Sequence, residues 1–340
     1  MPDLTRISAD SALPPTVTGT VVTVGTFDGV HRGHLDVLNR LVARASSTGM
    51  PSVLVSFDPH PLEVVNPVAA PLLLTSFEEK LEVIAETGVD YFAVLPFTHA
   101  LSAYSAEEFV DHVLRRRFRM RELLIGHDHG FGHHRAGNVT VVRALGARWR
   151  FQVDVVDAVA HADGQHVSST SIRRAVAGGD LVRAAEGLGR PYAVGGIVVR
   201  GQGRGRDLGF ATINVAPPSS RKLLPPEGVY AVVVQTPEGP FGGMMNLGPR
   251  PTFGESETTL EAHLFGASGD FYGARVRIDF IAFLRDTRKF ASAEELFRQL
   301  GRDRENALRA LTPLNAPDNL KGYGSPGRID ESQLRTPGVG

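Results

Sequence analysis

The chain has 340 residues, which is enough for two domains with separate hydrophobic cores. Its 36 Lys and Arg residues nearly balance its 37 Asp and Glu residues, so the overall charge does not favour nucleic acid as a partner. Cysteine is absent, which excludes disulfides, thiol nucleophiles and cysteine-ligated metals within the chain. There is no signal-peptide pattern and no apolar run of bilayer length. We therefore expect a cytoplasmic protein that binds neither nucleic acid nor membrane, and self-association stays open.

From residue 21 to about residue 179 the sequence alternates apolar strands with amphipathic helices. The predicted strands are Val21–Val24, Val53–Phe57, Tyr91–Leu95 and Glu122–Ile125. The predicted helices are one with Leu35, Leu38, Leu41, Val42 and Ala45 on one face, then Phe77–Glu86 and Ala106–Arg117. Strands separated by helices predict an α/β fold with a parallel sheet, in which ligands bind at the carboxyl ends of the strands.

Near residue 187 the pattern changes to short strands separated by Gly and Pro turns. These predicted strands include Gly195–Val199, Val229–Gln235, Leu260–Phe265 and Val276–Phe283. They predict a small antiparallel β-barrel, followed by a helix that begins with the capping box Ser292–Glu295. We place one domain at residues 15–186 and a second at residues 187–312. Residues 313–340 are rich in Pro, Gly and Asn, and we expect a disordered tail there.

The loop after the first predicted strand carries the most informative residues. It reads Gly25-Thr26-Phe27-Asp28-Gly29-Val30-His31-Arg32-Gly33-His34. His31 and His34 are three residues apart where the first helix begins, so they share a helical face near the first-turn N–H groups and the positive end of the helix dipole. This arrangement suits an anion, in particular the phosphate of a nucleotidyl transfer. A structural histidine pair and a zinc site remain alternatives, although no third zinc ligand is evident nearby.

Three further segments of the first domain follow predicted strands or begin a helix. Phe57-Asp58-Pro59-His60-Pro61 contains a rigid turn. The segment 125–135 contains four histidines within eight residues, for which a metal site is an alternative. In the segment Ser168-Ser169-Thr170-Ser171-Ile172-Arg173, the hydroxyls and first N–H groups can hold triphosphate oxygens, and Arg173 can neutralise developing charge. A simple helix N-cap is the alternative there.

Two polar segments fall in the predicted barrel. The segment Gly201–Phe210 is Gly-rich and basic but follows neither the Walker A nor the Rossmann spacing, so a flexible turn is the alternative. In the extended segment after it, Thr212 and Asn214 share one face. On a later strand, Glu261 and His263 face outward together, while the residues between and beside them face the core. A solvated strand face is the alternative for this pair.

The strand, the Gly-x-Phe-Asp-Gly-x-His-x-Gly-His loop and the helix resemble the signature of the HxGH nucleotidyltransferase superfamily. The Phe-Asp-Gly form resembles the adenylyltransferase module of the prokaryotic bifunctional riboflavin kinase/FMN adenylyltransferases. The other segments resemble further motifs of that family, namely Phe-x-Pro-His-Pro, Gly-x-Asp-Phe-x-Phe-Gly, Ile-Ser-Ser-Thr-x-Ile-Arg and Gly-Arg-x-Leu-Gly-Phe-Pro-Thr-Ala-Asn. The resemblance covers about residues 15–312. It implies a Rossmann-like domain with a parallel sheet, then a small antiparallel riboflavin kinase barrel with a C-terminal helix.

The resemblance also implies roles for individual residues. The implied catalytic residues are His31, His34 and Arg173 for adenylyl transfer and Glu261 as the general base of the kinase. The implied ATP- and phosphate-binding residues are Gly25, Phe27, Asp28, Gly33, Ser168, Ser169, Thr170, Gly205, Arg206, Thr212 and Asn214. The implied flavin-binding residues are Phe57, Pro59, His60, Asp128, Phe131 and Arg250. The resemblance further implies that Thr212 and Asn214 hold magnesium-ATP.

The implied activity has two steps, both on small-molecule substrates. The barrel makes FMN from riboflavin and ATP, and the α/β domain makes FAD from FMN and ATP with release of pyrophosphate; Mg²⁺ accompanies the ATP. Three residues depart from the family pattern, because His129 stands where an aromatic residue is usual, Ala211 replaces a proline and Ile213 replaces an alanine. The alternatives are a chain with only one active module, a catalytically silent flavin- or nucleotide-binding regulator, and an HxGH transferase for another substrate, such as a cytidylyltransferase.

Overall fold

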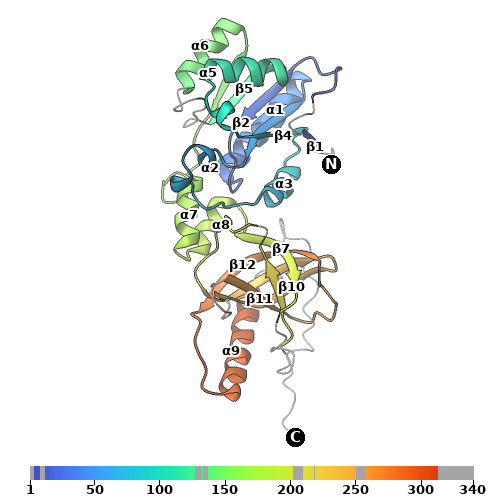
Figure 1. Ribbon diagram of the computed structural model, residues 1–340, viewed down its shortest axis with the longest axis vertical. Helices are drawn as coiled ribbons and strands as arrows, with labels where there is room; N and C mark the ends of the chain where they lie inside the picture. Colours follow the sequence, from blue (N-terminus) through green and yellow to red (C-terminus); the bar gives the residue numbers. More distant parts are fainter. Residues whose placement is uncertain are drawn as a thin grey trace. The chain divides into compact units, whose positions relative to one another are not determined.

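The structure is a computed structural model that describes residues 4–7, 12–126, 132, 137–201, 210–217, 219–249 and 258–312. It divides into two compact units, Met1–Ser171 and Ile172–Gly340, and the division falls within helix α7 (Ser169–Ala177). Figure 1 shows the elements of both units. The domain boundaries that we expected at residues 15, 186/187 and 312 stay predictions. The expected tail, residues 313–340, lies outside the described residues.

The first unit contains a parallel sheet of six strands, which confirms the predicted α/β fold. The strands are β1 (Thr5–Ile7), β2 (Thr20–Val24), β3 (Ser52–Asp58), β4 (Tyr91–Pro96), β5 (Met120–Gly126) and β6 (Gln152–Val156). Their order in the sheet is β1-β4-β3-β2-β5-β6. From β2 the chain proceeds to β3 and β4 on one side and then to β5 and β6 on the other. The strand order therefore reverses between β2 and β5, the position where open α/β sheets bind ligands.

Helices cover both faces of this sheet. One face packs against α1 (Arg32–Thr48) and α3 (Phe77–Ala85), and the other against η2 (Phe109–Arg117) and α6 (Val139–Trp149). Alternate residues of the central strands supply the two cores: Val21 and Leu54 face α1, whereas Val22 and Val53 face η2. Short helices occupy the loops after β3 and β4, namely α2 (Pro61–Val65), η1 (Pro67–Ala69) and α4 (His99–Ser102).

The predicted helix Ala106–Arg117 is helical but only partly α-helical. It begins as α5 (Ala106–Glu108) and continues as the π-helix η2, and the N–H of Phe118 donates to the carbonyl of Val113, five residues earlier. The apolar spacing correctly predicts the buried side, which includes Phe109 and Leu114. It does not predict the wider turn, because that turn is defined by backbone hydrogen bonds five residues apart, which side-chain spacing does not specify.

The second unit contains a closed barrel of six strands, which confirms the predicted antiparallel β-barrel. The strands are β7 (Ala193–Val199), β8 (Ile213–Ala216), β9 (Gly228–Thr236), β10 (Gly239–Pro249), β11 (Thr258–Leu264) and β12 (Arg275–Arg285). They close in the order β10-β11-β8-β7-β12-β9, and neighbouring strands are antiparallel. A Cβ at Gly243 of β10 would lie 2.5 Å from the carbonyl oxygen of His263, so β11 packs too closely for any side chain there.

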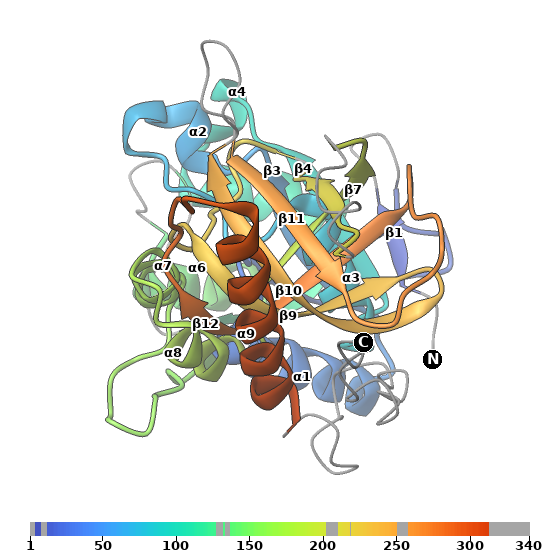
Figure 2. The same cartoon turned by 90° about the horizontal axis from the view of Figure 1, so that it is seen from below.

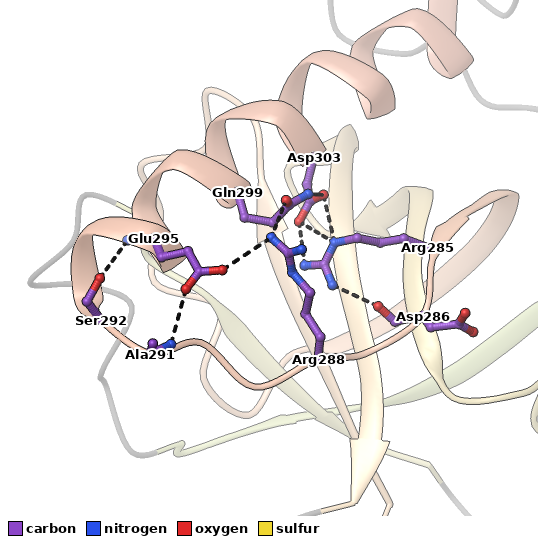
Figure 3. Close-up of polar contacts among 8 residues, drawn as sticks. All are labelled: Arg285, Asp286, Arg288, Ala291, Ser292, Glu295, Gln299 and Asp303. Carbon is purple, nitrogen blue, oxygen red and sulfur yellow. Dashed lines mark hydrogen bonds and ion pairs between the residues drawn. The ribbon is translucent and has the colours of Figure 1, made fainter.

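Helix α8 (Leu181–Leu188) precedes the barrel, and the long helix α9 (Ala293–Leu311) follows it. Figure 2 shows α9 lying along the outside of the barrel, where it packs on β9, β10 and β12. Ser292 caps α9 as predicted, because its side chain accepts the N–H of Glu295. Arg285 of β12 and the buried Asp303 of α9 form a bidentate ion pair at this contact (Figure 3). In the described part of the chain, no helix is long and apolar enough to span a bilayer.

Candidate active sites

The loop after β2 has an unusual backbone. Phe27, Gly29 and Val30 all adopt positive φ angles, of 47°, 84° and 38°. This region is unfavourable for a β-branched residue such as Val30, and such strain persists only where the surroundings enforce it. The tight turn leads directly into α1, so that His31 becomes the N-cap of that helix. The loop therefore lies at the point where the strand order reverses, with its histidines at a helix N-terminus.

The structure brings the two predicted catalytic histidines together. Nδ1 of His31 accepts the N–H of His34 at 3.3 Å, and the two rings stack with centroids 3.6 Å apart and planes 15° from parallel. The ring of Phe27 lies 4.8 Å from that of His34. Because Nδ1 of His31 accepts a hydrogen bond, the neutral ring carries its proton on Nε2. His31 is thus oriented as a hydrogen-bond donor through Nε2.

The predicted glycines leave room for these rings. A Cβ at Gly33 would lie 3.3 Å from the His31 ring, and a Cβ at Gly25 would lie 3.0 Å from the Phe27 ring. Both distances are tighter than ordinary contacts, so a side chain at either position would displace a ring that the site uses. The first-turn N–H groups of α1 face outward from the same helix end.

The segment before α3 holds this loop from one side. The buried carboxylate of Asp28 accepts the N–H groups of Leu74 and Thr75, each at 3.0 Å. The hydroxyl of Thr75 in turn accepts the N–H of Gly29 at 3.0 Å. Asp28 therefore ties two backbone segments together, and the predicted contact of Asp28 with ATP stays a prediction. No sequence pattern indicates this role for Thr75, which has the character of an ordinary turn residue before a helix.

Lys80 of α3 holds the loop through its side chain. Its Nζ donates to the carbonyl oxygen of Thr26 at 2.7 Å, and the side chain is buried. Burial lowers the pKa of Lys80, and the nearby carboxylates of Asp28 and Asp58 partly offset this effect. This role of Lys80 is not predicted by the sequence, because the run Glu78-Glu79-Lys80 at a helix start is typical of a solvated surface.

The predicted phosphate-binding serines contact the same loop. Oγ of Ser169 donates to the carbonyl oxygen of Asp28 at 2.9 Å, and Oγ of Ser168 accepts the N–H of Ser171 at 3.1 Å. The first contact joins the start of α7 to the loop after β2, and the second caps α7. Thr170 is exposed. Arg173 lies one turn further along α7, and its role in adenylyl transfer stays a prediction.

The predicted flavin segment follows β3. The ring of Phe57 packs edge-on against Phe97 at 5.3 Å. His60 caps α2, because its Nδ1 accepts the N–H of Leu62 at 3.2 Å. Pro59 follows a cis peptide bond. Two other predicted flavin-binding residues, Asp128 and Phe131, lie outside the described residues, so the flavin contacts of this unit stay predictions.

The barrel brings together three of its predicted site residues. Oγ1 of Thr212 donates to Oε1 of Glu261 at 2.7 Å, and Asn214 of β8 lies directly opposite Glu261 in the sheet. Asn246 of β10 lies opposite Glu261 on the other side and is exposed. The three neighbouring strands thus present a row of polar side chains. The outward direction of Glu261 is confirmed, since both of its neighbours on β11 are buried.

Asn214 is further fixed by Gly201, which lies two residues beyond the end of β7. A Cβ at Gly201 would lie 2.0 Å from Nδ2 of Asn214, so only glycine leaves space for the amide. The other predicted residues of this site, Gly205, Arg206 and Arg250, lie outside the described residues. Among the described residues there is no group of three or more His, Asp or Glu side chains placed to hold a metal ion.

Two family models match the chain. One is described as FAD synthetase and matches residues 13–171, and the other is described as riboflavin kinase and matches residues 188–311. The bifunctional riboflavin kinase/FMN adenylyltransferase of Escherichia coli strain K12 is 37% identical over 300 residues, which is 88% of this chain and 95% of the relative. The protein of the same description from Pseudomonas fluorescens is 38% identical over 305 residues, or 89% of this chain and 96% of the relative.

A solved structure is also similar over most of the chain. It is named a macrolide-efflux protein from Streptococcus pneumoniae, and it matches with a TM-score of 0.80 and 27% identity over 90% of this chain and 99% of that chain. Its name differs in kind from the two family models and the curated relatives, which agree with one another. The comparison supports the arrangement of a parallel sheet followed by a barrel.

Proposed function

The chain belongs to the family of bifunctional riboflavin kinase/FMN adenylyltransferases, and we propose that it makes FMN at its barrel and FAD at its parallel sheet. In the first reaction ATP phosphorylates riboflavin to FMN. In the second, FMN and ATP give FAD and pyrophosphate. The two family matches lie in the same order as the two folds, and each polar cluster described above falls within one of them.

The adenylyl-transfer proposal rests on one observation above all: the loop after β2 and the start of α7 meet through Ser169 and the carbonyl of Asp28. A phosphate oxygen of FMN attacks the α-phosphorus of ATP, and the bond to pyrophosphate breaks. Charge builds on the phosphate oxygens as this happens. Nε2–H of His31, the N–H groups of α1 that precede that of His34, and the Ser168 hydroxyl are donors for that charge. His34 supports the ring of His31, and Arg173 keeps its predicted role in neutralising the triphosphate.

The kinase proposal rests on the contact between Thr212 and Glu261. Glu261 accepts the proton of the terminal ribityl hydroxyl of riboflavin, whose oxygen attacks the γ-phosphorus of ATP. Thr212 and Asn214 orient the ATP phosphates from the neighbouring strand. The carboxylate is positioned for this role because Thr212 donates to one of its oxygens while Asn214 and Asn246 flank it.

A magnesium ion fits this donor set. The Thr212 hydroxyl and the Asn214 amide offer oxygen donors, the kind that Mg²⁺ prefers. When bound with ATP, the ion would neutralise phosphate charge. The residues implied to bind flavin and nucleotide keep their predicted roles in this proposal, as does a cytoplasmic location.

The test is a product assay with purified protein, ATP and Mg²⁺, started in parallel from riboflavin and from FMN. Riboflavin, FMN and FAD are separated by chromatography and detected by flavin fluorescence. Conversion of riboflavin to FMN and then FAD is the expected result. FAD from FMN with riboflavin untouched would show that the barrel is inactive, and no product from either start would favour a flavin- or nucleotide-binding regulator.

A further inference from the structure

We propose that His263 is a positioning residue of the barrel site, holding the carbonyl of Ala211 so that the adjacent Thr212 meets Glu261 and the ATP phosphates. The inference rests on the proposed riboflavin kinase activity. It assigns a role to a side chain that the sequence analysis placed only on a strand face.

The first observation is that β11 contacts the segment before β8 twice. Nδ1 of His263 lies 2.8 Å from the carbonyl oxygen of Ala211, and Glu261 accepts the hydroxyl of Thr212 at 2.7 Å. Glu261 and His263 are two residues apart on one strand, so both point to the same face. Strand β11 therefore bonds to two consecutive residues of this segment, to the backbone of Ala211 and to the side chain of Thr212.

The second observation is where the backbone pairing ends. The ladder between β8 and β11 runs from Val215 to Ile213, which pairs with Ala262. Ala211 and Thr212 lie just beyond its last pair. Side chains of β11 thus continue the attachment where backbone pairing stops, and the bond from His263 fixes the backbone there.

The third observation concerns the state of the imidazole. A carbonyl oxygen only accepts, so Nδ1 of His263 must carry a proton to bond with Ala211. Burial of the ring lowers the pKa of His263; the bond to Ala211 opposes this effect, and the charge of Arg304 on α9 adds to it. The ring lies edge-on to Phe210 at 5.1 Å and to Phe265 at 5.7 Å. A neutral ring with its proton on Nδ1 satisfies all of these contacts.

The test compares three variants of His263 in the full-length chain. His263→Asn keeps an N–H donor, since Nδ2 of Asn and Nδ1 of His are both bonded to Cγ. His263→Gln moves the donor one bond further out, and His263→Leu removes it. Thr259→Val is the matched control, because Thr259 lies on the same face of β11 but its hydroxyl donates to the carbonyl of Gly248 on β10.

The readout is the KM for ATP in riboflavin phosphorylation, with FMN adenylylation by the same preparation as the internal control. We expect His263→Leu and His263→Gln to raise this KM about tenfold, the scale of one lost hydrogen bond. We expect His263→Asn and Thr259→Val to stay within about twofold of the parent chain on the same scale, and adenylylation to stay unchanged in all four. Equal effects of His263→Asn and His263→Leu, or an equal effect of Thr259→Val, would overturn the proposal.

A second measurement separates this inference from the proposed function. Long-range ¹H–¹⁵N NMR of the histidine rings identifies which nitrogen of His263 carries the proton, whether or not the chain phosphorylates riboflavin. The Nδ1–H form is expected, and the Nε2–H form would overturn the inference. If the parent chain shows the Nδ1–H form but no kinase activity, the contact between His263 and Ala211 stands and the proposed kinase activity fails. The positioning role of His263 is then rejected together with the kinase activity.

Discussion

Oγ of Ser169 donates a 2.9 Å hydrogen bond to the carbonyl oxygen of Asp28, across a sequence separation of 141 residues. Asp28 is itself fixed by the backbone of Leu74 and Thr75. Two segments that are distant in the chain, one before α3 and one at the start of α7, therefore converge on one residue of the loop after β2. The loop has a strained backbone, and these bonds are the surroundings that enforce it.

Replacing Ser169 with Ala tests whether this convergence serves ATP binding. The variant loses the bond to Asp28 and one hydroxyl beside the proposed triphosphate site. We expect the KM for ATP in FMN adenylylation to rise about tenfold, with riboflavin phosphorylation unchanged. Ser47→Ala is the control, because Ser47 is an exposed serine of α1 whose hydroxyl bonds only within its own helix turn. A similar KM for Ser169→Ala and Ser47→Ala would contradict the assignment.

Replacing His31 with Asn separates the cap of α1 from the chemistry of the ring. Asn is a favourable N-cap, so the helix start is preserved, but the Nε2–H donor is lost. We expect adenylylation to fall about 10²-fold or more, the scale of losing one preorganised donor to a developing charge. The midpoint of urea unfolding, followed by the fluorescence of the single tryptophan, Trp149, should not change. Full adenylylation activity in this variant would remove His31 from the reaction.

The fold and the site could be predicted from the sequence to different depths, for physical reasons. The central strands are continuous apolar runs, so they were predicted; β1 and β6 were missed because edge strands carry fewer apolar residues. β10 was missed because glycines interrupt it, including Gly243, which the close approach of β11 requires. Local spacing thus predicts the elements with a regular apolar pattern, and misses those whose sequence serves an edge or a close contact.

The site shows the same limit. His31, His34 and Glu261 lie in compact motifs, so their grouping with a helix start or a strand face could be predicted. Lys80 and His263 act through bonds to backbone carbonyls of distant segments. A carbonyl acceptor has no signature in the sequence, because every residue carries one. These two contacts could be found only once the chain was folded.

Replacing Lys80 with Met tests whether the buried ammonium serves activity rather than stability. The variant loses the bond to the Thr26 carbonyl but no longer buries a charge, so we expect little loss of stability near pH 7 together with an adenylylation rate at least about tenfold lower. Riboflavin phosphorylation is the internal control. A large loss of stability with adenylylation per folded molecule unchanged would assign Lys80 a structural role instead.

The pH dependence of stability gives an independent check on Lys80. Its pKa is lowered in the folded chain, so between that value and its ordinary pKa in the unfolded chain, the unfolded chain binds more protons. Stability from this group therefore rises as the pH rises through that window, and is lowest below it. Urea unfolding at several alkaline pH values should show a steeper rise for the parent chain than for Lys80→Met. Parallel curves would show that the ammonium is not buried.

Replacing Glu261 with Gln tests its role as a general base. The amide oxygen of Gln still accepts the Thr212 hydroxyl, so the geometry of the row is kept while the basic carboxylate is lost. We expect riboflavin phosphorylation to fall about 10²–10⁴-fold, with adenylylation of supplied FMN unchanged. Glu238→Gln, at an exposed turn between β9 and β10, is the control for removing one carboxylate from this unit. Kinase activity close to that of the parent would mean that Glu261 only supports Thr212.

Replacing Asp303 with Asn tests how α9 is held on the barrel. Asp303 is 1% exposed and accepts Nε and Nη2 of Arg285 at 2.9 and 2.7 Å, and Gln299 donates to it at 2.8 Å (Figure 3). An amide has one acceptor oxygen, so it cannot accept both N–H groups of the guanidinium. It is also neutral, so the largely buried Arg285 loses its counter-charge. Breaking a buried pair in this way costs about 3–5 kcal/mol of unfolding free energy.

The loss should be confined to the barrel unit. Loss of kinase activity in urea reports the barrel, whereas Trp149 fluorescence reports the first unit and should not shift. Arg298→Ala is the matched control on the same helix, because its pair with Glu294 is exposed on both sides and should contribute little. If the barrel unfolds at the same urea concentration in the Asp303→Asn and Arg298→Ala variants, the apolar contacts under α9, rather than the ion pair, hold the helix in place.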